Sequence, residues 1–212
     1  MNSLWEYFNQ HDEGPGIWKW EHYFPVYQRH FEKFINKQVK ILEIGIYSGG
    51  SLNMWKRYFG KDCHIIGVDI EIECEAYESE DVTVFIGDQE DPAFWDDFVR
   101  RVPEIDILID DGGHTAEQQM VTLEKMLPHI RPGGVYLCED VHGISNRFTE
   151  FAAGLVRASN SFATPNDPTP FQADINSIHF YPFVVVIEKR SSKLTHLIAP
   201  KRGTQWQPFL DE

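Results

Sequence analysis

Short apolar runs alternate with amphipathic stretches along most of the chain. Five of the runs are continuous, rich in β-branched residues and end in Gly, Asp or Glu: 40–45, 64–69, 82–87, 106–111 and 135–140. Continuous apolar runs of this length are typical of strands buried on both faces of a parallel sheet. The pattern therefore predicts a parallel sheet at the centre of the protein.

Between these runs the apolar positions recur with a helical period. The helix-compatible segments lie near residues 50–59, 91–101, 115–129 and 146–159. Strands that alternate with helices build an α/β fold with helices on both faces of the sheet. The sequence thus predicts a Rossmann-like, doubly wound and mostly parallel seven-stranded sheet, with ligands bound at the carboxyl ends of the strands.

The end of the sheet follows a different rule. Two apolar runs, 178–189 and 194–200, are separated only by the sequence RSSK. A connection this short cannot cross over between parallel strands, but it suits a hairpin. We therefore expect the sheet to end in an antiparallel hairpin.

Aromatic residues crowd the region that precedes the sheet. They are Trp18, Trp20, Tyr23, Phe24, Tyr27, Phe31 and Phe34, with partly helical spacing after Pro25. Their rings can pack on the sheet as core, or one or two of them can cover the ligand cleft or a subunit interface. We expect a single domain overall, with a helical, aromatic-rich segment at 1–38 and the main α/β body at 39–212.

Residues 160–176 are rich in Pro, Asn and Asp and predict a loop. The loop is long enough to act as a lid over the site. An ordinary surface loop is the alternative, and the sequence does not choose between them.

Composition narrows the classes of partner. The chain has 33 acidic and 19 basic residues and a formal charge of −14, which disfavours nucleic acid and anionic membranes. The three cysteines lie far apart in the sequence, without the spacing of a disulfide pair or a metal site. An odd number of cysteines is consistent with free thiols in a reducing compartment. The N-terminus lacks a secretory pattern, and no run approaches the roughly 20 apolar residues of a membrane span. We therefore expect a cytoplasmic protein.

The stretch LEIGIYSGGS, residues 42–51, has the form of a nucleotide-binding turn. Counted from Gly45, the position of the second glycine in a dinucleotide fingerprint is Tyr47, which argues against NAD and FAD. No lysine follows Gly50, which argues against the phosphate loop of ATP and GTP sites. The expected ligand is a nucleoside without a phosphate chain.

Acidic residues at three strand ends describe that ligand further. Glu43 precedes the turn and can meet a cationic group, directly or through the turn. Asp69 ends the second run and can accept the ribose hydroxyls, while Asp88 is placed to reach an adenine edge. An adenosine with a cationic amino-acid tail would satisfy all three, whereas a turn with strand-end acids and no ligand is the alternative.

A second acidic group follows the next two runs, in DDGGH and EDVH. Adjacent strand ends would bring together six residues: Asp110, Asp111, His114, Glu139, Asp140 and His142. Four carboxylates at one cleft repel one another unless a cation compensates, and oxygen ligands suit Mg²⁺ or Mn²⁺. Consecutive strand residues point to opposite sides, so Asp110 can face the cofactor and Asp111 the metal, or the reverse.

Taken together, LEIGIYSGG, GVDI, GDQ and the expected terminal hairpin resemble the class I S-adenosylmethionine-dependent methyltransferases. IDDGGHT, LPHIRPGGVYLCEDVHG and SIHFYPFVVVIEK extend the resemblance to the metal-dependent sugar O-methyltransferases of macrolides and related glycosides. This resemblance implies S-adenosylmethionine and Mg²⁺ (or Mn²⁺) as cofactors. It also implies methyl transfer to a hydroxyl of a small-molecule sugar or glycoside, and a homo-oligomer, dimer or larger.

The resemblance assigns residues as well. It implies Asp111, Glu139 and Asp140 as metal ligands and His114 as general base, while His142 is a second base, a substrate contact or a plain loop residue. The expected cofactor contacts are Glu43, Gly45, Tyr47, Ser48, Gly49, Asp69, Asp88, Gln89 and Asp110. For His114, the alternative is a helix-start histidine that caps the turn before TAEQQMVTLEKML.

Three other functions stay open at this point. The same acidic group would serve methylation of a catechol or another vicinal diol. A relative of the cephalosporin hydroxylases would need a redox metal instead. A noncatalytic cofactor-binding protein would leave the clustered carboxylates unexplained.

Overall fold

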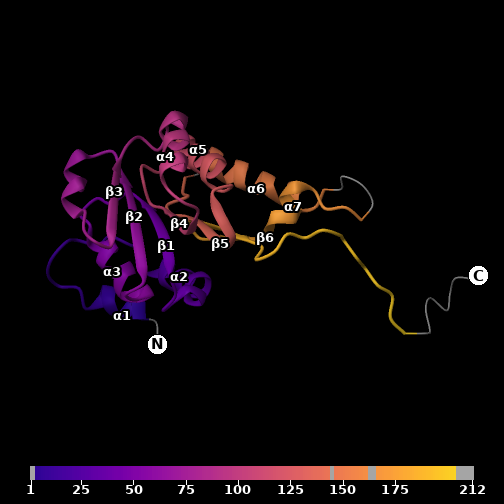
Figure 1. Ribbon diagram of the computed structural model, residues 1–212, viewed down its shortest axis with the longest axis horizontal. Helices are drawn as coiled ribbons and strands as arrows, with labels where there is room; N and C mark the ends of the chain where they lie inside the picture. The colour runs from indigo at the N-terminus through magenta and orange to yellow at the C-terminus, as the bar shows by residue number, and fades with distance from the viewer. Residues whose placement is uncertain (1–2, 144–145, 162–165, 204–212) are drawn as a thin grey trace, which may run out of the picture.

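The computed structural model describes residues 3–143, 146–161 and 166–203, and a seven-stranded sheet with the order β3-β2-β1-β4-β5-β7-β6 runs through it (Figure 1). The first five strands are parallel, and β7 runs antiparallel to both β5 and β6. This arrangement confirms the predicted fold class. The strands are β1 Val39–Ile44, β2 Cys63–Asp69, β3 Val82–Ile86, β4 Ile105–Asp110, β5 Ile130–Cys138, β6 Ile175–Tyr181 and β7 Val184–Lys189.

The helices predicted between the strands are present, and three of the four, α4 to α6, start at a residue whose side chain caps the first turn. Asp91 accepts from the N–H of Ala93 at the start of α4, and Thr115 and Gln118 form a capping box at the start of α5. No helix in the described ranges has the length and apolar character that a membrane span needs. The α-helices are α1 Ser3–Asn9, α2 Phe24–Phe31, α3 Gly50–Phe59, α4 Pro92–Arg101, α5 Ala116–Met126, α6 Arg147–Ser159 and α7 Pro170–Asp174; the 3₁₀ helices are η1 Glu21–Tyr23, η2 Glu32–Phe34 and η3 Ile72–Tyr77.

The helices cover both faces of the sheet. Figure 1 shows α1, α2 and α3 along one side and α4, α5 and α6 along the other. On the first side Phe24, Tyr27 and Phe31 are buried with Trp55 of α3 against the sheet, so these rings are core. Trp18, by contrast, is 87% exposed. The aromatic region therefore divides into core rings and exposed rings.

The terminal hairpin is confirmed, but its predicted position is wrong. The chain reverses at Pro182 and Phe183, between β6 and β7, whereas we expected 178–189 to be one strand paired with 194–200. Pro182 has no N–H to donate, and Phe183 adopts a left-handed φ of +62°, so the apolar run breaks at these two residues. The segment after β7 forms no strand as far as residue 203 and runs away from the body (Figure 1).

The predicted loop 160–176 is shorter than expected. Residues 162–165 lie outside the described ranges, but Pro170–Asp174 form α7 and β6 begins at Ile175. A capping box between Thr169 and Gln172, with Pro170 at the first helical position, starts this helix. The proline that indicated a loop therefore starts a helix here.

Candidate active site

A cavity of about 560 Å³ opens at the carboxyl ends of the five parallel strands, β1 to β5. The turns after these strands, together with residues 16–20 and Tyr23, form its walls. Most of the predicted site residues line it. These are Gly45, Tyr47, Ser48, Asp69, Asp88, Gln89, Asp111, His114, Glu139, Asp140 and His142.

The glycine turn after β1 is held from both sides. Gly45 has a φ of +88°, and a side chain there would collide with the backbone carbonyl of Asp111. Across the turn, Asp69 Oδ2 accepts from the backbone N–H groups of Ile46 at 2.8 Å and Tyr47 at 3.0 Å. Asp69 thus ties the turn to β2 while its carboxylate faces the cavity.

Glu43 lies beneath this turn, outside the cavity lining. Its carboxylate accepts from Ser51 Oγ and from Trp55 Nε1, both at 2.9 Å, which fastens α3 to β1. Burial raises its pKa, and the ammonium of Lys19, 3.8 Å away, opposes that rise. The cation that Glu43 meets within the protein is therefore Lys19. A direct cofactor contact stays a prediction.

Two other predicted cofactor contacts lie outside the lining. Asp110 is buried and accepts from Gln89 Nε2 at 2.9 Å, and burial raises its pKa to about 6. Gln89 lines the cavity and accepts from the N–H of Gly113 at 2.8 Å, so it joins Asp110 to the turn after β4. Gly49 packs against the ring of Tyr77 with a φ of +75°.

A buried lysine sits among the carboxylates. Lys19, only 7% exposed, forms ion pairs with Asp111 and with Glu139, the latter at 3.0 Å. Burial alone would lower its pKa, but the charges of Asp111, Glu139 and Glu43 outweigh burial and raise it. Lys19 therefore supplies one positive charge to this acidic group.

Aromatic hydroxyl and indole groups complete the acidic group. Tyr23 Oη and Trp20 Nε1 donate to Asp140 Oδ1 at 2.7 and 2.9 Å, and Tyr27 Oη donates to Glu139 Oε1 at 2.7 Å. Some of the aromatic residues thus line the cavity and others form core. The sequence does not predict which carboxylate each of these aromatic side chains binds. The density of aromatic residues around Lys19 indicates only that some of them can line the cavity.

Three side chains bring possible metal ligands together. Donor atoms of Asp111, His114 and Asp140 all lie within 4.8 Å of one another. His114 Nε2 is 3.5 Å from Asp140 Oδ2 and 4.0 Å from Asp111 Oδ1. The carboxylates of Asp111 and Asp140 are a donor set that suits a hard divalent ion, and their side chains, 18% and 19% exposed, remain open to the cavity.

Glu139 lies beside this group rather than within it. Lys19 contacts its Oε2 and Tyr27 its Oε1, and the residue is fully buried. Burial, with the neighbouring charge of Asp111, raises its pKa. Ligation by Glu139 stays a prediction that requires Lys19 to withdraw.

The two candidate bases differ in their surroundings. His114 adopts a φ of +60°, and its Nδ1 is buried without a hydrogen-bond partner among the described residues. His142 is exposed at the cavity rim and packs edge to face on Phe183, with ring centroids 5.6 Å apart. His114 is therefore the histidine next to the carboxylates.

Comparison with known proteins adds a family and a set of relatives. Residues 42–141 match the family described as "Methyltransferase domain". The chain is 34% identical over 194 residues to mycinamicin VI 2''-O-methyltransferase of Micromonospora griseorubida, covering 79% of this chain and 48% of that protein. It is 30% identical over 202 residues to 8-demethyl-8-alpha-L-rhamnosyl tetracenomycin-C 2'-O-methyltransferase of Streptomyces olivaceus, covering 84% and 53%.

A solved structure shares the fold. The chain superposes with a TM-score of 0.76 and 29% identity on MycE methyltransferase in complex with Mg, SAH and mycinamycin VI, covering 89% of this chain and 53% of that one. The chain thus spans about half the length of these relatives.

Proposed function

Because the chain belongs to the class I S-adenosylmethionine-dependent methyltransferases, we propose that it transfers a methyl group from S-adenosylmethionine to a hydroxyl of a sugar or glycoside. One observation carries the proposal. Asp111, His114 and Asp140 converge in the same cavity whose other walls are the glycine turn and Asp69. A single cavity therefore offers both a cofactor half, where S-adenosylmethionine would bind, and an acceptor half, where the hydroxyl would be activated.

The cofactor half consists of the turn after β1 and the ends of β2 and β3. Asp69 is assigned to the ribose hydroxyls and Asp88 to the adenine edge. The bulk of Tyr47 leaves the turn unsuited to a pyrophosphate. The relative with the shared fold was solved with SAH, the demethylated form of the same cofactor.

The acceptor half consists of the turns after β4 and β5. Asp111 and Asp140 would hold Mg²⁺, with Glu139 as a further ligand if Lys19 withdraws. The bound ion would lower the pKa of an acceptor hydroxyl beside it. His114, next to both carboxylates, would take the proton, because a neutral imidazole is the side chain that most often acts as a general base.

The substrate class is argued from the relatives. One relative is named as a 2''-O-methyltransferase of mycinamicin VI, and the other as a 2'-O-methyltransferase of a rhamnosyl tetracenomycin C. The solved relative carries Mg and mycinamycin VI. We therefore place the acceptor among glycosides that present vicinal hydroxyls. A homo-oligomer and a cytoplasmic location stay predictions.

A mass-shift screen tests the proposal. The protein is incubated with S-adenosylmethionine, Mg²⁺ and a panel of glycosides, partly methylated sugars and catechols, and products heavier by one methyl group are sought. We expect glycoside products, their loss in excess chelator, and their return with Mg²⁺ or Mn²⁺. Products from catechols alone would move the acceptor to that class. Cofactor binding without any product would favour a noncatalytic role. Full activity in excess chelator would show that methyl transfer needs no metal ion.

A further inference from the structure

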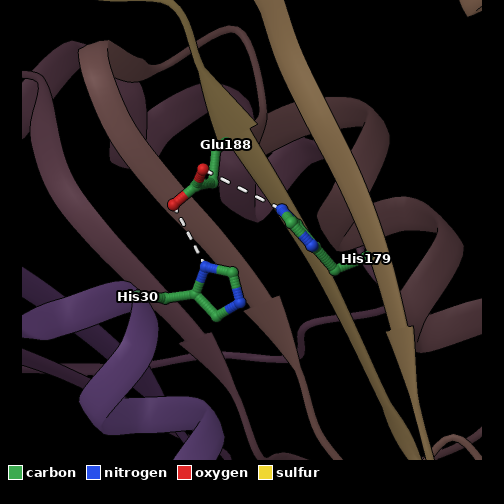
Figure 2. Close-up of side chains that lie close together, drawn as sticks. All are labelled: His30, His179 and Glu188. Carbon is green, nitrogen blue, oxygen red and sulfur yellow. Dashed lines mark hydrogen bonds and ion pairs between the residues drawn. The ribbon is translucent and has the colours of Figure 1, made fainter.

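A second group of metal-binding side chain types lies outside the cavity lining, where α2 meets the terminal hairpin. His30 of α2, His179 of β6 and Glu188 of β7 converge, with one donor atom of each within 4.8 Å of the others (Figure 2). We propose that these three residues bind a divalent transition-metal ion, Zn²⁺, that fastens α2 to the hairpin.

The distances need little change to accept an ion. His30 Nδ1 lies 3.0 Å from Glu188 Oε1, and His179 Nε2 lies 3.9 Å from Glu188 Oε2. Ligand atoms bound to a tetrahedral zinc ion at about 2.0–2.2 Å are about 3.3–3.6 Å apart. Small rotations of the three side chains, which come from three different elements, would therefore form the site.

Hydrogen bonds outside the group orient the ligands. His30 Nε2 lies 2.9 Å from Tyr181 Oη, and His30 Nδ1 lies 3.0 Å from Glu188 Oε1. Without an ion, Nδ1–H donates to the carboxylate; the other tautomer, which donates from Nε2 to Tyr181, would leave the lone pair of Nδ1 for an ion. Metal-bound histidines use their second ring nitrogen in this way. Ser177 Oγ donates to Glu188 Oε2 at 3.2 Å and lies 3.0 Å from His179 Nε2. Tyr181 can thus accept from the His30 tautomer that an ion needs, and Ser177 orients the carboxylate of Glu188.

The donor types select the class of metal. Two imidazoles and one carboxylate suit zinc and its neighbours in the transition series, whereas Mg²⁺ prefers oxygen ligands. His30 is buried, while the side chains of His179 and Glu188 are 26% and 20% exposed, which leaves a fourth position for water. Because none of the three residues lines the catalytic cavity, the ion would be structural.

A metal-free ion pair is the competing explanation. Lys33 Nζ lies 3.5 Å from Glu188 Oε1, and a hydrogen bond from His30, followed by the charge of Lys33, lowers the pKa of Glu188 to about 2. The side chain of Lys33 is 43% exposed, so it can turn into solvent when an ion takes its place. The ion pair alone predicts no zinc affinity at these residues.

The position of the site gives the ion a role. His30 lies one turn after Tyr27 on α2, and Tyr27 donates to Glu139 in the catalytic cavity. An ion that joins α2 to β6 and β7 would therefore hold the helix that reaches the acidic group.

Calorimetry on the full chain tests the proposal without any measurement of methyl transfer. The protein is stripped with chelator, saturated with Mg²⁺ and titrated with Zn²⁺, and its melting temperature is measured with and without zinc. We expect one bound zinc ion per chain and a melting temperature raised by zinc. His179→Ala should weaken zinc binding at least ~100-fold, since loss of an outer partner alone costs 10–100-fold, and should remove the thermal shift.

Three further variants make the result decisive. His196→Ala, which removes an exposed histidine outside the group, should bind zinc like the wild type. Asp111→Asn should also retain zinc, because that residue belongs to the other group. Glu188→Gln keeps the side-chain shape but loses the carboxylate, so it should weaken zinc binding even if His179→Ala folds poorly. Unchanged zinc affinity in both His179→Ala and Glu188→Gln, or its loss in Asp111→Asn, would overturn the proposal.

Discussion

His114 adopts a left-handed backbone conformation at the edge of the Asp111 and Asp140 pair. If it is the general base, His114→Ala should lower kcat by roughly 10²–10⁴-fold, the range that positioned acid–base groups supply. Cofactor affinity should change little, because the histidine is not assigned to the cofactor. Steady-state kinetics and calorimetry with S-adenosylhomocysteine measure the two quantities separately.

The backbone conformation calls for a second variant at the same position. Asparagine tolerates a positive φ better than alanine, so His114→Asn removes the imidazole with less strain. An equal loss of kcat in both variants assigns the effect to the imidazole. Loss of kcat in His142→Ala with normal kcat in both His114 variants would transfer the role of base to His142.

Asp69 combines a ligand-binding role with a structural one. Asp69→Ala should weaken S-adenosylhomocysteine binding by roughly 10–100-fold, the equivalent of hydrogen bonds to one charged group. Because the same carboxylate holds the N–H groups of Ile46 and Tyr47, Asp69→Asn serves as the control that keeps one acceptor oxygen. Calorimetry with circular dichroism separates binding from folding, and unchanged affinity in Asp69→Ala would remove the residue from the site.

Single residues of the site were predictable to different degrees. Asp69, Asp111 and Asp140 could be placed because the carboxyl ends of parallel strands form one edge of the sheet, and a run of apolar residues marks where each strand ends. Lys19 could not be placed, since it reaches Asp111 across 92 residues of chain and no local pattern encodes that contact. Lys19 stands between Trp18 and Trp20, but this local pattern does not indicate which carboxylates the lysine contacts.

At the scale of elements, α2 is joined to the acidic group through Tyr27. Burial, with the charge of Glu139, raises the pKa of Tyr27, so its hydroxyl stays protonated and donates to Glu139. Tyr27→Phe should therefore lower the free energy of unfolding by about 1–3 kcal/mol, because it leaves a buried acceptor oxygen without its donor. Urea denaturation measures the change.

Tyr58 provides the matched control on α3. Its hydroxyl is buried and lacks a hydrogen-bond partner among the described residues, so Tyr58→Phe removes a polar atom that gains nothing from burial. Its free energy of unfolding should stay the same or rise. Equal destabilisation by both substitutions would show that the loss comes from removing any buried hydroxyl, and not from the bond between Tyr27 and Glu139.

Elements were predicted well where periodicity and capping agree. Helices α3 to α6 follow amphipathic segments, and several begin at residues whose side chains cap the first turn. The hairpin was displaced because Pro182 and Phe183 sit inside one apolar run, where a left-handed phenylalanine leaves no compositional mark. Likewise, α7 lies in a proline-rich stretch that resembles a loop until Thr169 and Gln172 are recognised as a cap.

At the scale of the whole molecule, the three cysteines report on folding. All are free and buried, and burial raises the pKa of Cys63 to about 12 and that of Cys74 to about 11. A raised pKa keeps each thiol protonated at pH 8, and the thiolate is the reactive form. We expect no rapid reaction with a thiol reagent in the native state and three reactive thiols in denaturant. Fast native labelling would mean that the core opens.

The contacts between the N-terminal aromatic region and the turn after β5 set an order of assembly. The bonds from Lys19, Tyr23 and Tyr27 to Glu139 and Asp140 close loops of 112 to 120 residues, whereas Asp69 reaches the glycine turn across 22 or 23. Closing a longer loop costs more chain entropy, and contacts between distant residues form slowly. During refolding from denaturant, S-adenosylhomocysteine binding should therefore return before methyl transfer, which stopped-flow binding and timed activity assays would resolve. During synthesis, the proposed cofactor pocket would likewise form early. The proposed acceptor half would form only after the end of β5 has been synthesised and has met Tyr23 and Tyr27.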